Sequence, residues 1–246
     1  MGFGNSFGIS SETNNNIQTK GLVFYIDAAY KKSYPRSGTV WTDLVGANNG
    51  TLTNGPTFNS DDGGSIVFDG VNDVVTVPDN STLEIDAVTI SIWTQFGSDV
   101  DGFAATVFGR TGGGNSPYKI RSAGSAATSN IYFQTRNSDA SLGVGPTVTP
   151  GSTFSLNEWV NLSFSYDYDN SDARMQVYVN GQLHDSNTSG GATLKIDSSQ
   201  SFEAMRSAHD GAHRSGKIAN VQIYNRGLTA SDVLQNYNAQ KQRFGL

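Results

Sequence analysis

Asp69, Asn72 and Asp73 lie within one short segment, FDGVND, and carry the kinds of oxygen atom that a calcium ion prefers. A tight acidic turn can direct several carboxylate, amide and carbonyl oxygens at one Ca²⁺. The same side chains also have a local use, because Asp and Asn cap turns by accepting hydrogen bonds from nearby backbone N–H groups. The sequence leaves both readings open: a calcium site at Asp69, Asn72 and Asp73, or a self-capped turn. It indicates no other cofactor.

Most covalent chemistry is excluded by what the chain lacks. There is no cysteine, so there is no thiolate nucleophile, thiolate metal site or disulfide. The sequence has no Gly-x-Ser-x-Gly turn, phosphate-binding loop or His-Glu-x-x-His helix. His209 and His213 have a spacing that suits a metal only on a helix, and Gly211 and Gly216 predict a loop there instead.

Charge and hydropathy narrow the classes of partner. The net charge of −6 and the absence of a Lys/Arg-rich run argue against nucleic-acid binding, which rests on many basic contacts to phosphate. No apolar run approaches the roughly 18 residues of a membrane-spanning helix. The first twenty residues have neither a basic start nor an apolar core, so no secretory signal is expected. We therefore expect neither a nucleic-acid nor a membrane partner.

The elements that position these residues are short strands. Apolar, β-branched and aromatic residues recur in brief runs separated by Asn, Asp and Gly turns, and the sequence VNGQ around Asn180-Gly181 is typical of a two-residue hairpin. Strands are predicted at residues 22–26, 65–69, 74–77, 88–96, 105–109, 131–136, 159–166, 175–179 and 217–224. Residues 121–130, rich in Gly, Ser and Ala, are predicted to form a surface loop.

One helix is predicted, near the end of the chain. Thr229 suits its N-cap, Asp232 suits its first turn, and Leu228 could pack against its start. Many strands with a single terminal helix predict an all-β antiparallel sandwich. Residues 1–20, rich in Gly, Asn and Ser, are interpreted as an extended N-terminal arm, and residues 21–246 as one domain.

A series of segments, in this order, resembles the laminin G-like, or concanavalin A-like lectin/glucanase, domain. The segments are GLVFYIDA (21–28), WTDLVGANNGTL (41–52), SIVFDGVNDVVTVP (65–78), VTISIWTQF (88–96), NEWVNLSFSYD (157–167), VYVNGQLH (177–184) and KIANVQIYNRGLTASDVLQNYN (217–238). The resemblance implies a jelly-roll sandwich of two antiparallel sheets. Many members have an acidic turn at the position of FDGVND. The opening segment and the tail QNYNAQKQRFGL are also similar to those of marine bacteriophage structural proteins.

The resemblance implies two activities, hydrolysis or binding of glycans. Hydrolases of this kind carry a Glu-x-Asp-x-Glu pattern, because glycoside hydrolysis needs two carboxyl groups across the bond. The nearest match here is Glu84-Ile85-Asp86-Ala87-Val88, in which valine replaces the second glutamate. The sequence therefore predicts a protein that is not an enzyme. A degenerate glycan hydrolase acting through Glu84 is the remaining alternative of that class.

Glycan binding calls for aromatic and polar side chains displayed on loops. The residues with these properties are Arg110, Asn115, Tyr118, Arg121, Arg206, His209 and Asp210. Trp93 and Trp159 lie within strand patterns and are expected in the core.

The function predicted from these observations is a virion structural or adhesion protein, such as a phage decoration, fibre or tail component, that displays a lectin-like sandwich to host or environmental glycans. Its partners would be other virion proteins, reached through the arm, and further copies of itself in a homo-oligomer. Absence of cysteine suits assembly in a reducing host cytoplasm. The alternatives are a purely architectural capsid or fibre subunit without a ligand, and an extracellular or cell-surface location.

Overall fold

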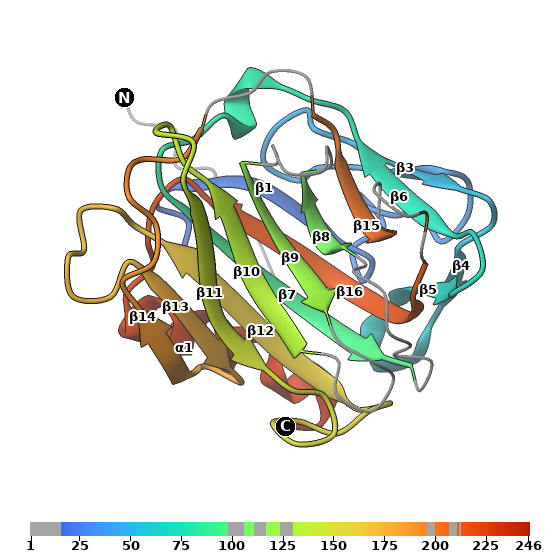
Figure 1. Cartoon of the computed structure of the whole chain (residues 1–246). Coiled ribbons are helices and arrows are strands. Elements are labelled where there is room, and N and C mark those ends of the chain that lie inside the picture. The colour runs from blue at the N-terminus through green and yellow to red at the C-terminus, as the bar shows by residue number, and fades with distance from the viewer. Residues whose placement is uncertain are drawn as a thin grey trace, which may run out of the picture.

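The structure is a computed structural model that describes residues 16–97, 106–110, 117–123, 130–195, 200–206, 211 and 213–246. Two eight-stranded antiparallel sheets, A and B, lie face to face, and one α-helix, α1 (Ala230–Gln240), follows the last strand (Figure 1). This confirms the predicted all-β jelly-roll sandwich with a single C-terminal helix. No helix among the described residues is long and apolar enough to cross a membrane.

Sheet A is built around the long strand β16, which pairs with β7 on one side and with β5 and then β1 on the other. The strands of sheet A, in order, are β14 (Gln182–Asn187), β13 (Met175–Val179), β12 (Trp159–Tyr166), β7 (Val88–Phe96), β16 (Ser215–Tyr224), β5 (Ser65–Asp69) and β4 (Thr57–Asn59), with β1 (Leu22–Asp27) against β16.

Sheet B lies in front of sheet A in Figure 1 and contains the segments that the sequence predicted least well. Its strands, in order, are β11 (Leu142–Val148), β10 (Asn130–Arg136), β9 (Tyr118–Ala123), β8 (Thr106–Arg110), β15 (Phe202–Arg206), β6 (Val74–Val77), β3 (Gly50–Thr53) and β2 (Val40–Trp41). The short 3₁₀ helices among the described residues are η1 (Asp61–Gly63), η2 (Ser81–Leu83) and η4 (Lys241–Phe244).

The predicted loop over residues 121–130 is wrong at both ends, because residues 121–123 complete β9 and Asn130 begins β10. The small residues of that stretch hid the alternation of Tyr118 and Ile120, which are buried, with Lys119 and Arg121 on the other face. Residues 124–129 lie outside the described residues. The nine predicted strands all occur, with ends shifted by at most two residues.

Aromatic rings from both sheets form the core between them. Phe24 of β1 lies 6.0 Å from Phe108 of β8, and Phe133 of β10 lies 6.0 Å from Phe164 of β12, measured between ring centroids. All four side chains are buried. Contacts of this kind across the sandwich fix which side chains of each strand point inward. Side chains that alternate with them along a strand of sheet B therefore point to its outer face.

The outer face of sheet A has a second core of its own. Trp93 is fully buried there, with its ring centroid 4.1 Å from that of Phe244 and 5.7 Å from that of Tyr237 on α1. Trp159 is half-buried beside them, and its indole N–H donates to Asp62 Oδ2 at 2.7 Å. Both tryptophans therefore pack under the C-terminal segment and not between the sheets.

Helix α1 begins as the sequence predicted. The Thr229 hydroxyl accepts a hydrogen bond from the Asp232 N–H, and the Asp232 carboxylate accepts one from the Thr229 N–H, which is a capping box. Leu228 packs in one cluster with Val233 across this turn and holds the entry of the chain into the helix.

The predicted two-residue hairpin turn at Asn180-Gly181 is confirmed and joins β13 to β14. Asn180 (φ 48°) and Gly181 (φ 78°) have the positive φ values of a type I′ turn. A Cβ on Gly181 would lie only 2.8 Å from Tyr237 Cβ, so glycine also permits the close approach of α1.

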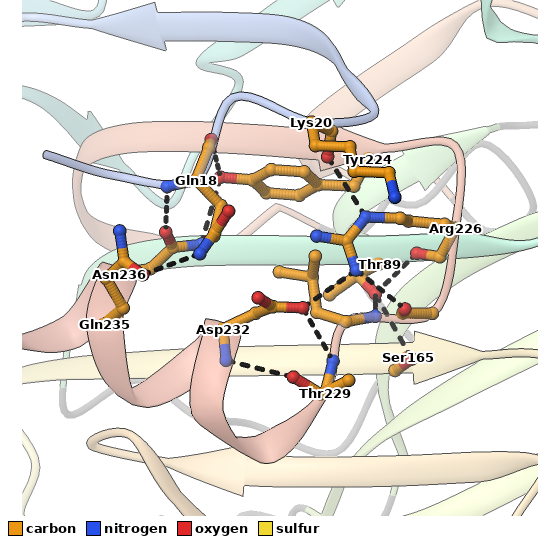
Figure 2. A network of polar contacts seen from close by, with 12 residues as sticks. Gln18, Lys20, Thr89, Ser165, Tyr224, Arg226, Thr229, Asp232, Gln235 and Asn236 are labelled. Carbon is orange, nitrogen blue, oxygen red and sulfur yellow. Dashed lines mark hydrogen bonds and ion pairs between the residues drawn. The ribbon is translucent and has the colours of Figure 1, made fainter.

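Residues 16–20 lie against α1 and the end of β16 (Figure 2). Their hydrogen bonds run from Gln18 N to Asn236 Oδ1 (2.7 Å), from Gln18 Nε2 to Gln235 Oε1 (2.6 Å), from Gln235 Nε2 to Asn16 O (2.8 Å), from Tyr224 OH to Gln18 O (3.1 Å) and from Arg226 Nε to Lys20 O (3.1 Å). The predicted arm boundary after Lys20 therefore falls within hydrogen-bonded structure. Residues 1–15 lie outside the described residues.

A buried ion pair joins η4, near the C-terminus, to the end of β1. Arg243 in η4 donates from Nη1 to both carboxylate oxygens of Asp27, at 2.8 and 3.0 Å. Its other nitrogens donate to the backbone carbonyls of Asp62 and Gly64. Burial raises the pKa of Asp27, and the Arg243 charge opposes this. The pair thus fastens η4 over the end of β1.

Candidate binding site on the outer face of sheet B

The outer face of sheet B is polar because β9 and β10 alternate between apolar residues that point inward and polar residues that point outward. Ile120 on β9 and Phe133 on β10 belong to the core between the sheets. Their neighbours Lys119 and Gln134 must therefore point to the opposite face. The sequence thus places charged and amide groups on the one broad sheet face that α1 does not cover.

Four positions form a registered row that we call the floor row: Glu203, Gly109, Lys119 and Gln134. Glu203 pairs with Gly109, Gly109 with Lys119, and Lys119 with Gln134. The three side chains are largely buried, with exposed fractions of 7% for Glu203 and 8% for both Lys119 and Gln134. Adjacent strands lie about 4.8 Å apart, so the floor row sets a carboxylate and an ammonium on the two sides of a residue without a side chain.

Gly109 is required at the centre of this row. A Cβ built there would lie 2.4 Å from both Cα and Cβ of Lys119, which no rearrangement of a side-chain tip could relieve. Glycine lets β8 and β9 approach, and no side chain of β8 stands between Glu203 and Lys119 in this row.

A second row, which we call the rim row, lies two residues further along β9 and β10 and three residues further along β15: Arg206, Arg121 and Tyr132. The backbone of Thr106 pairs with both Arg206 and Arg121, and Arg121 pairs with Tyr132. The Arg121 guanidinium lies 5.7 Å from the centroid of the Tyr132 ring, and its Nη1 donates to Gln134 Oε1 at 3.1 Å. The rim row is more accessible than the floor row, since the Arg206 side chain is 37% exposed.

Met205 explains why Arg206 faces outward. Its φ of 60° is unusual for a residue with a long side chain, and its side chain is buried in the core, next to Ala204 along the strand. Two consecutive inward residues break the alternation, as at a bulge, and turn Arg206 toward Glu203. Arg206 Nη1 lies 2.9 Å from Glu203 Oε1.

The electrostatics of the floor row follow from its burial. Burial, followed by the charges of Arg121 and Arg136, lowers the pKa of Lys119 to about 8. Burial raises the pKa of Glu203, against the opposing effect of Arg206. Glu203 Oε2 is buried without a hydrogen-bond partner. Burial therefore disfavours the charged form of both Lys119 and Glu203.

The structure brings together only two of the predicted ligand-binding residues, Arg121 and Arg206. Asn115, His209 and Asp210 lie outside the described residues. Tyr118 is not displayed on a loop: it lies in β9, is 1% exposed, and donates its hydroxyl hydrogen to Leu83 O. That prediction is wrong because Tyr118 has the same parity as Ile120 and points into the core.

Arg110 is also buried, against the expectation of a displayed side chain. It is 1% exposed, pairs with Asp79, and lies over the Phe202 ring at 5.2 Å. Phe108 and Arg110 are two residues apart on β8, so both point inward. An arginine can hold such a position because its flat guanidinium stacks on a ring and an acid neutralises its charge.

In the acidic turn of residues 69–73, several carboxylate oxygens accept hydrogen bonds from backbone N–H groups of the turn itself. Asp69 Oδ1 accepts hydrogen bonds from the N–H groups of Val71 and Asn72, and the first of these is the main reason why the pKa of Asp69 is lowered. Asp73 Oδ2 accepts from the Asp69 N–H, while its Oδ1 is buried without a partner. Within the described ranges, no three His, Cys, Asp or Glu side chains are grouped to hold a metal. Calcium binding by Asp69, Asn72 and Asp73 stays a prediction.

Sequence reasoning missed Lys119, Glu203, Gln134 and Tyr132. The signal for Gln134 and Tyr132 was present, because they alternate with Ile131 and Phe133 in a strand that was predicted. Glu203 was hidden because β15 is short and Met205 breaks its alternation.

Comparisons with known proteins agree with this architecture. The family model described as the concanavalin A-like lectin/glucanases superfamily (Laminin_G_3) matches residues 69–234. The receptor binding domain of botulinum neurotoxin C/D mosaic serotype is similar, with a TM-score of 0.69 and 14% identity, over 89% of this chain and 51% of that chain. A comparison with curated proteins finds no match.

Two further solved structures contain sugars. The botulinum neurotoxin serotype D ligand binding domain in complex with N-acetylneuraminic acid has a TM-score of 0.67 and 13% identity, over 89% of this chain and 51% of that chain. Trypanosoma rangeli sialidase in complex with sialic acid has a TM-score of 0.64 and 17% identity, over 92% of this chain and 34% of that chain. The chain spans about half the length of the neurotoxin domains and a third of the sialidase. At these identities the likeness concerns the fold.

Proposed function

Because the chain belongs to the concanavalin A-like lectin/glucanases superfamily, we propose that it is a non-enzymatic adhesion protein that binds glycans on the outer face of sheet B. The observation that carries the proposal is the registered pair of rows, in which charged, amide and aromatic side chains lie on the strands around Gly109, which has no side chain. Binding sites of this kind combine an aromatic surface with a few fixed polar groups.

The rim and floor rows supply complementary parts of a sugar site. The half-buried Tyr132 ring offers a flat apolar surface for the C–H face of a sugar, and its stacking partner Arg121 offers N–H donors beside it. Gln134 adds an amide, which can both donate and accept. The sialic acid complexes of two structurally similar proteins support a glycan as the ligand.

We propose binding without hydrolysis because the described strands of sheet B offer one carboxyl group on this face and not two. Glu203 is the only acidic residue in the described strands of sheet B. Glu84 and Asp86, the nearest match to a catalytic pattern, lie between η2 and β7 and not on a sheet face. Cleavage of a bound oligosaccharide that disappeared in Glu203→Gln or Glu84→Gln would contradict this part of the proposal.

Glycan binding can be located with three variants. Tyr132→Ala and Arg121→Gln should each weaken binding about tenfold or more, because each removes a central contact of the site. Lys20→Gln is the matched control, since it removes one exposed positive charge on the side of α1. A glycan array would identify a ligand, and titration calorimetry on folded variants would give the affinities.

Two outcomes would count against the site. Equal affinity in all four proteins would place the glycan elsewhere on the molecule. A flat array for the wild-type protein, repeated with calcium, would favour the purely architectural alternative.

We further propose that this sandwich is a surface component of a virion, joined to other virion proteins and to copies of itself through residues 1–15. The proposal draws on the similarity of the opening segment and the tail QNYNAQKQRFGL to marine bacteriophage structural proteins. Because residues 16–20 are hydrogen-bonded to α1, we take the arm that would mediate assembly to be residues 1–15.

Two truncations separate assembly from folding. Removing residues 1–15 should convert a defined oligomer into a folded monomer, as measured by size-exclusion chromatography with light scattering. Removing residues 1–20 should in addition lower the free energy of unfolding by about 1–3 kcal/mol, because the hydrogen bonds to α1 are lost. An unchanged oligomer without residues 1–15 would refute assembly through the arm.

A further inference from the structure

The first ten residues, MGFGNSFGIS, have the sequence pattern of a β-strand. The odd positions hold the larger side chains, among them Phe3, Phe7 and Ile9, and the even positions hold only Gly or Ser. Because successive side chains of a strand point to opposite faces, such a strand has one apolar face and one face of very small residues. Its backbone N–H and C=O groups need partners, which an edge of a sheet can supply.

Strand β14 is an edge of this kind, at the end of sheet A beside α1 (Figure 1). Among the described residues no strand pairs with its outer side, and its first four residues are exposed. Val179 and Gln182 are the hydrogen-bonded pair that closes the two-residue turn, so the N–H and C=O of the next residue, Leu183, point away from β13. A bulge at His184 follows, so side-chain contacts must add to a short ladder here.

Leu183 offers an apolar contact on this edge. It pairs with Tyr178, which is buried in one cluster with Val233 of α1, so both side chains lie on the outer face of sheet A. Tyr178 is covered, whereas Leu183 is 50% exposed. The edge therefore leaves a large apolar side chain beside unpaired backbone groups.

A second exposed leucine, Leu234, lies on the side of α1 that faces β14. It is one helical turn before Tyr237, which approaches Gly181 in the turn between β13 and β14. Leu234 is 36% exposed. Gln235 is rotated away from this side and bonds to Asn16, so residues 16–20 lie on the opposite flank of the helix. The β14 flank is thus free of them.

We propose that residues 1–10 of one copy of the chain add as a strand to the β14 edge of a second copy, with their apolar face packed against Leu183 and Leu234. This inference rests on the proposed assembly through residues 1–15 and names the surface to which that segment binds. Main-chain hydrogen bonds to β14 would hold the strand, and its larger side chains would cover the two leucines. A reciprocal exchange closes a dimer, in which each copy supplies one strand and one edge.

The alternation of the segment also fits the other side of this edge. Sheet B closes against the end of β14, where Asn187 Nδ2 donates to Val144 O of β11 at 3.0 Å. A strand added to β14 points every second side chain toward that side. The Gly and Ser residues at the even positions leave room there, while the odd positions face Leu183.

The position of Asn16 favours a second copy as the source of the strand. Asn16 is held by Gln235 on the flank of α1 away from β14. Residues 11–15 join it to the strand pattern and span at most about 17 Å. Half the circumference of a helix about 10–12 Å across is also about 17 Å, so the whole linker would be used up in going around α1. A neighbouring copy can present its β14 edge without this constraint.

The test places the damaged strand and the damaged edge on different full-length molecules. The double variant Phe3→Ser, Phe7→Ser loses the apolar face of the strand and keeps the edge. Leu183→Lys keeps the strand and blocks the edge, because an exposed lysine opposes pairing. Each variant alone should self-associate at least about tenfold more weakly than the wild-type protein, as measured by size-exclusion chromatography with light scattering over a dilution series.

Mixing the two variants gives the decisive result. The intact strand of Leu183→Lys can bind the intact edge of the phenylalanine variant, so an equimolar mixture should form a one-to-one complex. Leu142→Lys is the matched control, since it replaces a similarly exposed leucine (45%) on β11 of sheet B, and it should associate like the wild-type protein. Thermal unfolding of each variant confirms that folded proteins are compared.

Each other outcome has a definite meaning. An oligomer that persists in Leu183→Lys and is lost in the phenylalanine variant would overturn docking on β14 and leave assembly through residues 1–15 intact. Two weakly associating variants that fail to form a complex when mixed would also overturn it. A monomeric wild-type protein would exclude a second copy as the partner. An oligomer unaffected by either variant, and by removal of residues 1–15, would overturn the proposed assembly itself.

Discussion

Replacing Arg243 with methionine should lower the free energy of unfolding by about 3–5 kcal/mol, because it leaves the carboxylate of Asp27 buried without its counter-charge. Asp27 is 1% exposed and receives two hydrogen bonds from Arg243. The substitution also leaves the carbonyls of Asp62 and Gly64 without this donor. Chemical denaturation followed by far-ultraviolet circular dichroism would measure the loss.

The control for this prediction lies in the same 3₁₀ helix. Lys241→Met removes a charge whose ammonium lies 5.5 Å from the Tyr237 ring centroid, and it should cost no more than about 1 kcal/mol. Adding Asp27→Asn to Arg243→Met should recover more than about 1 kcal/mol, because the uncompensated charge is removed as well. A double variant as unstable as the single one would show that the charge of Asp27 is not the cause.

The pH dependence of the Arg243→Met variant gives an independent check. Burial already raises the pKa of Asp27 above its usual value, and loss of Arg243 should raise it further. Between the usual value and the raised one, the folded state binds a proton that the unfolded state does not, so stability increases as the pH falls. The deficit of Arg243→Met relative to the wild-type protein should therefore be smaller at pH 5 than at pH 8.

Trp93→Ala should also cost about 3–5 kcal/mol, since it removes the fully buried tryptophan of the second core. The ring of Trp93 stacks on Phe244 and Tyr237, so its loss should also loosen α1 and η4 on the outer face of sheet A. Hydrogen exchange should locate the effect in α1, residues 16–20 and β16. The affinity of the folded variant for a glycan on sheet B should not change.

Trp93→Phe separates ring packing from hydrogen bonding. The indole N–H of Trp93 is buried without a described partner, so phenylalanine loses no hydrogen bond and should recover most of the stability. A loss as large in Trp93→Phe as in Trp93→Ala would show that stacking on Phe244 contributes little.

The sequence predicts sheet A better than sheet B. Strands such as β7 and β12 are long and buried on both faces, so their apolar and β-branched runs are easily recognised. The α1 capping box and the Asn180-Gly181 turn are local patterns, and they needed no tertiary information. β9 and β15 are shorter, and Met205 interrupts the alternation that would reveal β15.

The candidate site was predicted only in part, because its residues come together through register. Arg121 and Arg206 were named from their residue types, but nothing local shows that both pair with Thr106. Arg110 and Tyr118 were named for the same reason and point the other way. A residue type indicates what a side chain can do, whereas its parity in a strand decides whether it faces a ligand.

The docking of residues 16–20 on α1 determines which way the molecule would be displayed. Residues 16–20 lie beside α1, which packs on the outer side of sheet A (Figure 2). The floor and rim rows belong to sheet B and alternate with the core residues of its strands. A chain anchored through residues before Asn16 would hold sheet A toward its support and sheet B toward the surroundings. Many copies anchored in this way would share one orientation, so weak individual contacts could add up to strong attachment to a repetitive glycan surface.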